Sequence, residues 1–206
     1  MRRAQEAPRW GDQLRTLARI AQAFSPGAPV DRYALFVGID AKATEEIVAL
    51  SQGLPHYTHL LALHAAQVAA KAGRRNITLD DVDQAIGRAV QKAQQSIVSA
   101  YHAATSSPRK DSLYEEVLLA CAMAKTDDLG YFAAADVREP LSRITGKPYD
   151  IPAYSRHLND FSDARGPVLQ KTGSPRRYRF RFINPMMQPF VLMRGRDKGL
   201  LPRKGR

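Results

Sequence analysis

Residues 177–182, RYRFRF, alternate basic and aromatic side chains, and this pattern limits the folds open to the chain. A period of two is typical of a β-strand, whose successive side chains point to opposite faces. The two faces are an arginine face and an aromatic face, made of Arg177, Arg179 and Arg181 and of Tyr178, Phe180 and Phe182. Because a lone strand cannot bury an aromatic face, the stretch requires a partner strand and a core.

The residues before this strand supply both. Residues 167–172, PVLQKT, are strand-like, and the GSP that follows them predicts a hairpin. Helical patterns precede the hairpin at residues 111–125, 134–146 and 151–166. In the second pattern, Pro140 favours a start near Glu139 or a kink. Three helices followed by a hairpin predict a winged helix, in which the hairpin is the wing.

The first half of the chain has helical patterns only. Apolar residues recur at helical spacing over residues 11–24, 40–53, 55–72 and 76–104. Gly53 and Gly73 suit helix ends, whereas Pro55 suits a first helical position. Thr78 suits the cap of the last helix, which is predicted to be continuous. These patterns predict a helical bundle.

The fold class that follows is mainly α with a small β-hairpin, a helical bundle followed by a winged helix-turn-helix domain. Residues 105–112, TSSPRKDS, have the composition of a linker. The predicted organisation is an N-terminal helix and linker (1–39), a helical domain (40–105), a linker (106–110), a winged helix (111–194) and a basic tail (195–206).

The net charge of +11 is concentrated at the C-terminal end. Residues 1–164 carry 19 basic and 19 acidic residues, whereas residues 165–206 carry 12 basic residues and one acid, Asp197. An excess confined to so short a segment is typical of a surface that faces a polyanion. Double-stranded DNA is therefore the expected partner.

In a winged helix the third helix enters the major groove and the wing contacts the flanking phosphates. The third helix here offers Tyr154, Ser155, Arg156 and Asn159 early, and Arg165 just past its end. Arginine can read guanine and asparagine can read adenine, although Asp160 and Asp163 would repel phosphates. Phosphate contacts are expected from Lys171, Arg176, Arg177, Arg179 and Arg181, extended by Arg194, Arg196, Lys198, Arg203, Lys204 and Arg206. The alternative is a solvated edge strand that its charges protect from aggregation.

Few other residues could carry chemistry. Cys121 lies in the apolar run VLLACAMA, which favours a core position, and a single cysteine suits a reducing cytosol. His56, His59 and His64 lie on one predicted helix, and His56 and His59 share a face, but the same turn offers no cysteine or carboxylate to complete a metal site. Ser155, His157 and Asp160 have the residue types of a catalytic triad, yet Ser155 and His157 point to different sides of a helix. We expect no metal and no hydrolase. With no secretory signal and no membrane-length apolar run, a cytoplasmic location is expected.

Two segments of the first half share motifs with a known family. Residues 51–70, SQGLPHYTHLLALHAAQVAA, and residues 77–90, ITLDDVDQAIGRAV, resemble the helical lid of AAA+ and STAND ATPases, including transposition-type ATPases. The first resembles the G-x-P element that opens the lid helix, and the second resembles the I-T-x-D-D-V-x-x-A pattern of the last lid helix. The origin-recognition initiators also have a winged helix C-terminal to such a lid, and the predicted domain order of this chain resembles theirs. The resemblance covers roughly residues 40–190 and implies descent from an ATP-dependent, DNA-associated ATPase.

The chain departs from this family at the nucleotide site. A phosphate loop needs G-x-x-x-x-G-K-[ST], but Gly146-Lys147 is followed by Pro148 and lies after a helix. We therefore expect no ATP hydrolysis and no cofactor, with ATP bound only where another chain supplies an ATPase core. By resemblance, nucleotide contacts would come from Gly53, Leu54, Pro55 and His56. The alternative is that Gly53 ends one helix and Pro55 begins the next, with no ligand.

A second function stays open at this stage. In STAND proteins, which the chain resembles, a winged helix often packs on the ATPase core without touching DNA. Residues 184–193, NPMMQPFVLM, contain methionines, which adapt to irregular partner surfaces. The alternative function is a regulatory or protein-interaction module of a STAND or AAA+ ATPase.

Overall fold

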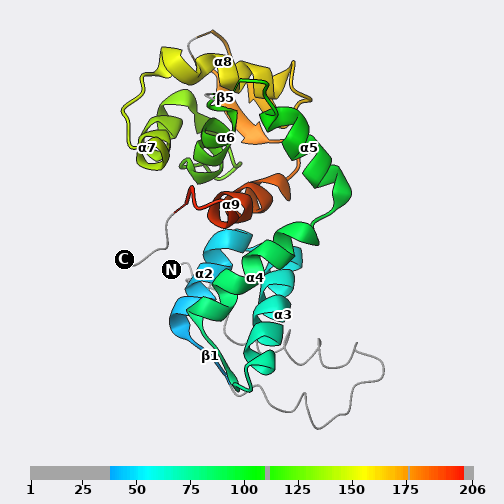
Figure 1. Ribbon diagram of the computed structural model, residues 1–206. Helices are drawn as coiled ribbons and strands as arrows, with labels where there is room; N and C mark the ends of the chain where they lie inside the picture. Colours follow the sequence, from blue (N-terminus) through cyan, green and yellow to red (C-terminus); the bar gives the residue numbers. More distant parts are fainter. Residues whose placement is uncertain (1–37, 110–111, 176, 202–206) are drawn as a thin grey trace, which may run out of the picture. The chain divides into compact units, whose positions relative to one another are not determined.

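The computed structural model describes residues 38–109, 112–175 and 177–201. The predicted helix over residues 11–24, Arg176 and the tail basics Arg203, Lys204 and Arg206 lie outside these ranges. The chain divides into two compact units, residues 1–89 and 90–206. Over the described residues the fold is mainly helical with a small amount of sheet, as predicted (Figure 1).

From residue 38 on, the first unit combines three helices with a short parallel strand pair. In chain order the elements are β1 (Gly38–Ile39), α2 (Ala41–Ser51), α3 (Pro55–Lys71), β2 (Asn76–Ile77) and α4 (Leu79–Gln91). Gly38 lies opposite Asn76 in the strand pair, and the Asp40 amide donates to the carbonyl of Ile77 at 2.9 Å. Neither strand is predicted from the sequence, because two residues are too few to show an alternation.

The three helices of this unit bury apolar side chains three or four residues apart. The buried side chains include Ala43, Ile47, Leu50, Tyr57, Leu61, Ala65, Val82, Ala85 and Ile86. Helices α2 and α3 pack on each other. Burial raises the pKa of Tyr57 to about 12, so its hydroxyl is protonated at neutral pH.

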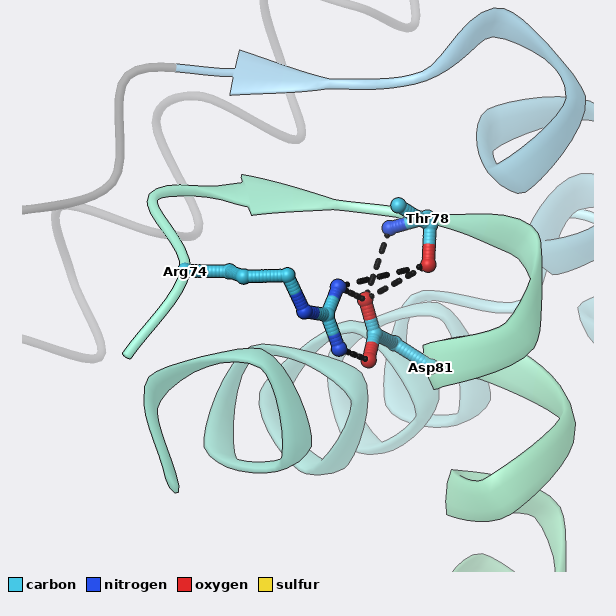
Figure 2. A network of polar contacts seen from close by, with 3 residues as sticks. All are labelled: Arg74, Thr78 and Asp81. Carbon is cyan, nitrogen blue, oxygen red and sulfur yellow. Dashed lines mark hydrogen bonds and ion pairs between the residues drawn. The ribbon is translucent and has the colours of Figure 1, made fainter. Parts of the chain in front are cut away.

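A bidentate ion pair fixes the start of α4 (Figure 2). Arg74 Nη1 donates to Asp81 Oδ2 at 2.7 Å, and Nη2 donates to Oδ1 at 2.5 Å. The backbone N–H and the hydroxyl of Thr78 each donate to Asp81 Oδ2 at 2.8 Å. The Arg74 guanidinium, helped by the Thr78 donors, lowers the pKa of the fully buried Asp81 carboxyl to about 2. The carboxylate thus completes the predicted cap at Thr78.

Replacement of Asp81 by asparagine is expected to destabilise the first unit by about 2 kcal/mol, because it leaves buried donors without a charged acceptor. A carboxyl whose pKa falls from 3.8 to about 2 on folding stabilises the fold above pH 3.8 and loses this effect as the pH falls through 2. Thermal unfolding by circular dichroism between about pH 6 and pH 2 measures both effects. The Asp81→Asn variant should lose less stability over this interval than wild type, and the exposed Asp128→Asn control should behave as wild type. Equal pH dependence in wild type and Asp81→Asn would contradict the assignment.

The pattern predicted as one helix over residues 76–104 forms two helices. α4 ends at Gln91, and α5 (Gln95–Thr105) begins after residues 92–94. α5 buries Ile97 and Tyr101, and packs on α6 (Tyr114–Met123) and α9 (Met187–Asp197). The division between the units therefore precedes α5, whereas the prediction places α5 in the first domain. The break leaves no signal in the sequence, because Val90 and Ile97 are seven residues apart, as in a continuous helix.

The second unit holds the predicted hairpin and one unpredicted strand. Its remaining elements are β3 (Phe132–Ala133), α7 (Ala134–Thr145), α8 (Ile151–Ser162), β4 (Leu169–Thr172) and β5 (Arg179–Phe182). β4 and β5 are antiparallel, with Leu169 opposite Phe182 and Thr172 opposite Arg179, which confirms the hairpin. β3 pairs with the other edge of β5, so the strand order is β3–β5–β4. β3 is missed because it is only two residues long.

Helix α7 begins at Ala134 and ends at Thr145, which confirms the helix predicted over residues 134–146; of the two alternatives given for Pro140, the later start near Glu139 is wrong. The Asp136 carboxylate accepts a hydrogen bond from the backbone N–H of Ala133 at 2.7 Å and stabilises this earlier start. Pro140 lies inside the helix and is buried. Proline has no backbone N–H, so one hydrogen bond inside the helix is missing at this position. The cap at Ala133 offsets part of that loss of stability.

Helix α6 forms the centre of the second core and contacts α7, α8 and α9. Residues 117–122 are all buried, and Cys121 is a free buried thiol, as its apolar surroundings predict. Burial raises the pKa of Cys121, so the thiol has no nucleophilic character at neutral pH. No helix within the described ranges is long and apolar enough to cross a membrane.

Candidate nucleic-acid interface

Helix α8 has one buried face and one exposed polar face. Tyr154, Leu158 and Phe161 are buried, whereas Arg156 and Asn159 are exposed three residues apart on the opposite side. The Arg156 side chain is 84% exposed, and its Nε lies 3.7 Å from Asp160 Oδ2. The exposed face therefore presents an arginine and an asparagine to solvent, with the partly covered Asp160 beside them.

Lys171 of β4 extends this face. Its Nζ donates to Asn159 Oδ1 at 2.9 Å and lies 4.2 Å from the centre of the Tyr178 ring. The hydrogen bond joins α8 to the hairpin on one side of the sheet. Sequence reasoning selects both residues but not their contact, because no pattern marks a lysine–asparagine pair twelve residues apart.

The loop between β4 and β5 is shaped by a glycine. Gly173 has a φ of 95°, and a Cβ there would approach the Arg177 carbonyl oxygen to 2.6 Å. The Arg177 amide donates to the carbonyl of Ser174 at 2.9 Å, which closes the turn. Among the described residues, the Arg177 side chain is exposed and has no hydrogen bond or ion pair. Lys171 and Asn159 are in contact, Arg156 lies on the same helix face as Asn159, and the exposed Arg177 lies in the turn at the end of the hairpin; these four residues are called the α8–wing surface below.

Arg179 and Arg181 lie on the other face of the sheet. Directly opposite residues point the same way, and Lys171 faces Phe180, whereas Gln170 faces Arg181. Arg179 is 46% exposed and forms an ion pair with Asp127 at 3.0 Å. Arg181 donates to Gln170 Oε1 at 2.7 Å and lies 4.7 Å from the Tyr131 ring centre. The predicted alternation of β5 holds, but its arginines face away from Lys171 and already have partners.

Two further predicted contacts on α8 have internal roles. The Tyr154 side chain is fully buried and its hydroxyl donates to the carbonyl of Ala134 at 2.8 Å, so the prediction that Tyr154 contacts DNA is wrong. Ser155 is half-buried and its hydroxyl donates to the carbonyl of Pro152 at 3.2 Å. The sequence does contain a signal for this burial, because Tyr154, Leu158 and Phe161 have the i, i+4, i+7 spacing of a buried helix face.

Arg165 also has an internal role instead of the predicted DNA contact. Its Nη1 donates to the carbonyls of Ala104 at 3.2 Å and Ser106 at 2.6 Å. Its guanidinium lies 3.5 Å from the centre of the Tyr114 ring. Tyr114 in turn donates to Asp160 Oδ2 at 2.6 Å. Arg165 therefore ties the end of α5 to the start of α6 beneath α8.

Replacement of Arg165 by methionine is expected to destabilise the second unit by about 1–2 kcal/mol, because two carbonyls lose their charged donor. Its affinity for duplex DNA should stay unchanged. Thermal unfolding and a binding titration measure the two effects. Arg156→Met is the matched control, with the opposite expectation of unchanged stability and weaker binding. An Arg165→Met variant of full stability and reduced affinity would contradict this assignment.

The basic residues of α9 and Lys198, which directly follows it, are paired within the second unit. Arg194 Nη1 lies 2.9 Å from Asp197 Oδ2, and Lys198 pairs with Glu115. Arg196 donates to the carbonyl of Leu201 at 3.4 Å. These contacts reduce the positive charge that this helix offers a polyanion. The geometry therefore gives no support to the prediction that the phosphate-binding surface extends along α9.

The residues expected to contact nucleotide form a self-contained turn. Gln52 and Gly53 have φ values of 50° and 73°, which end α2. Pro55 then occupies the first turn of α3, and the Leu54 amide donates to the carbonyl of Ser51 at 2.9 Å. Pro55 and His56 are exposed. One helix ends at this turn and the next begins, which is the arrangement expected of the alternative that needs no ligand.

The remaining candidate groups are not assembled into catalytic sites. His157 packs edge-on against Tyr114 at 4.6 Å between ring centres, and burial lowers its pKa. Ser155 bonds to a backbone carbonyl instead of His157. Within the described ranges, no three His, Cys, Asp or Glu side chains are placed to hold a metal ion.

No protein-family model matches the chain, and no curated protein matches it either. Its function is therefore inferred from its own residues. Of these, the α8–wing surface combines exposed cationic side chains from two elements that are hydrogen-bonded to each other.

Proposed function

We propose that this protein binds double-stranded DNA through the α8–wing surface. The element order from α6 to β5 is helix, strand, helix, helix, strand, strand, with the first strand added to the edge of the hairpin. This is the order expected of a winged helix, whose third helix lies in the major groove. The hydrogen bond from Lys171 to Asn159 carries the proposal, because it holds the hairpin and α8 in position to contact one duplex together.

The charges of the surface support phosphate contact. Arg156, Lys171 and Arg177 are exposed cations, and the exposed Asp163 opposes them at the end of α8. Lysine and arginine at the rim of a groove-binding helix neutralise phosphates and release counterions. The three cations outnumber Asp163 and the partly covered Asp160, which lies 3.7 Å from Arg156, so the surface favours binding with a modest number of contacts.

Descent from a nucleotide-dependent ATPase is part of the same proposal. The lid-like segments of residues 51–70 and 77–90 form helices α3 and α4, with the ion pair of Arg74 and Asp81 at the start of α4. Neither segment brings residues that could cradle phosphates. We propose that the chain does not hydrolyse ATP alone and that an ATPase core on another chain is its second partner.

The proposal is tested by titrating the full chain into a fluorescent mixed-sequence duplex at several salt concentrations. The logarithm of the binding constant should fall linearly with the logarithm of the salt concentration, with a slope of about −2 to −4 for three or four phosphate contacts. Duplex binding that is absent at low salt, or present but independent of salt, would overturn the proposal.

One observation favours the alternative function of a protein-interaction module. Ile183 is 52% exposed and Leu129 is 71% exposed, and such apolar side chains suit a partner surface. Ile183 also lines shallow grooves beside Pro167 and Met187. A module of this kind would bind no duplex at any salt concentration and would co-purify with an ATPase core.

A further inference from the structure

We infer that the α8–wing surface reads guanine, because Lys171 engages the acceptor atom of Asn159, while the amide nitrogen of Asn159 and the guanidinium of Arg156 stay exposed as hydrogen-bond donors. This inference rests on the proposed DNA binding and deepens it. The observation behind it is the 2.9 Å contact between Lys171 Nζ and Asn159 Oδ1.

The contact fixes which way the Asn159 amide points. An ammonium group has three donors and no acceptor, so the amide atom that it contacts must be the oxygen. The amide nitrogen of the exposed Asn159 therefore points away from Lys171 and is available as a donor. A free asparagine pairs with adenine through one donor and one acceptor, and the Lys171 ammonium competes with adenine for that acceptor while it leaves the donor free.

Arg156 adds donors on the same helix face, one turn before Asn159. A guanidinium has five N–H donors and no acceptor. Its Nε lies toward Asp160 at 3.7 Å, which leaves the two terminal nitrogens of a side chain that is 84% exposed. These two nitrogens have the spacing needed to bond two neighbouring acceptors.

Guanine is the base that best matches paired donors. In the major groove it presents two acceptors, N7 and O6, whereas adenine presents one acceptor and one donor. Thymine presents one acceptor beside a methyl group, and cytosine presents a donor. The carboxylates near this surface do not favour another base. Asp160 already accepts a hydrogen bond from Tyr114. The exposed Asp163 can accept from the amino group of cytosine, which is the base paired with guanine.

The test compares three versions of one mixed-sequence duplex in titrations with the full chain. One version contains guanine, the second contains 7-deazaguanine, which lacks the N7 acceptor, and the third contains inosine, which keeps N7 and O6. The inference predicts binding at least about fivefold weaker to the 7-deazaguanine duplex and nearly unchanged to the inosine duplex. Equal, salt-dependent binding to the guanine and 7-deazaguanine duplexes would overturn the inference and leave DNA binding intact. No binding to any of the three would overturn both.

Two variants locate the effect. Asn159→Asp keeps an oxygen for Lys171 but loses the amide donors, and Lys171→Met releases the amide. In each, the ratio of guanine to 7-deazaguanine affinity should fall at least about twofold, and this ratio cancels uniform changes in charge. Gln91→Glu, at an exposed position of α4, changes the net charge as Asn159→Asp does and should keep the wild-type ratio. A wild-type ratio in both Asn159→Asp and Lys171→Met would overturn the inference.

Discussion

Replacement of Gly195 by valine is expected to lower the free energy of unfolding of the second unit by about 3 kcal/mol. Gly195 lies in α9, where a Cβ would come within 2.7 Å of both Cδ atoms of Leu119 on α6. Leu119 is itself buried and cannot move aside freely. Urea unfolding by circular dichroism measures the loss. Alanine should cost less, because its higher helix propensity offsets part of the clash.

A second-site change tests the stated cause. Leu119→Ala makes room for the valine, so the double variant should lose less stability than the two single changes added together. Losses that add without interaction would contradict the close contact of α6 and α9. Asp81→Asn serves as a control in the same experiment, since it should destabilise the first unit instead.

Charge reversal of Lys171 and Arg177 to glutamate is expected to weaken duplex binding roughly 100-fold at low salt. Each reversal removes a phosphate contact and adds a repulsion on the α8–wing surface. The slope of the salt dependence should become shallower by about two. Fluorescence anisotropy with the full chain measures both quantities.

The matched control reverses two exposed lysines of the first half, Lys42 and Lys92, and changes the net charge equally. Its duplex affinity should fall only slightly, because these residues lie outside the α8–wing surface. A similar loss in both double variants would mean that overall charge, and not this surface, sets the affinity. Arg181→Ala should leave binding unchanged, because Arg181 faces Gln170 and Tyr131.

The hairpin can be predicted from the sequence because its aromatic and basic residues alternate without interruption. Phe180 lies buried and Arg179 exposed, as the period of two requires. The strands β1, β2 and β3 cannot be predicted in this way, since each has two residues and depends on a distant partner. The break between α4 and α5 is equally invisible, because it is set by tertiary packing and not by a glycine or proline.

The candidate site is less predictable than the fold. Residue type identifies Arg156, Asn159, Lys171 and Arg177, which the structure leaves on an accessible surface. The same reasoning selects Arg165 and Arg179, whose partners are a pair of carbonyls and a carboxylate in the loop before β3. The loop sequence TDDLGY contains a usable signal, since Asp127 accepts from the amides of Leu129 and Tyr131 in an Asx-type turn. Its ion pair with Arg179 depends on the unpredicted strand.

The location of the DNA contact is tested most directly by hydrogen exchange of the full chain with and without a saturating duplex. The proposed interface predicts slower amide exchange at residues 151–162 and 169–178 in the presence of duplex, with exchange in α9 and β3 unchanged. Protection confined to the segments around Leu129 and Ile183, or no protection at α8 and the β4–β5 loop under saturating conditions, would contradict it.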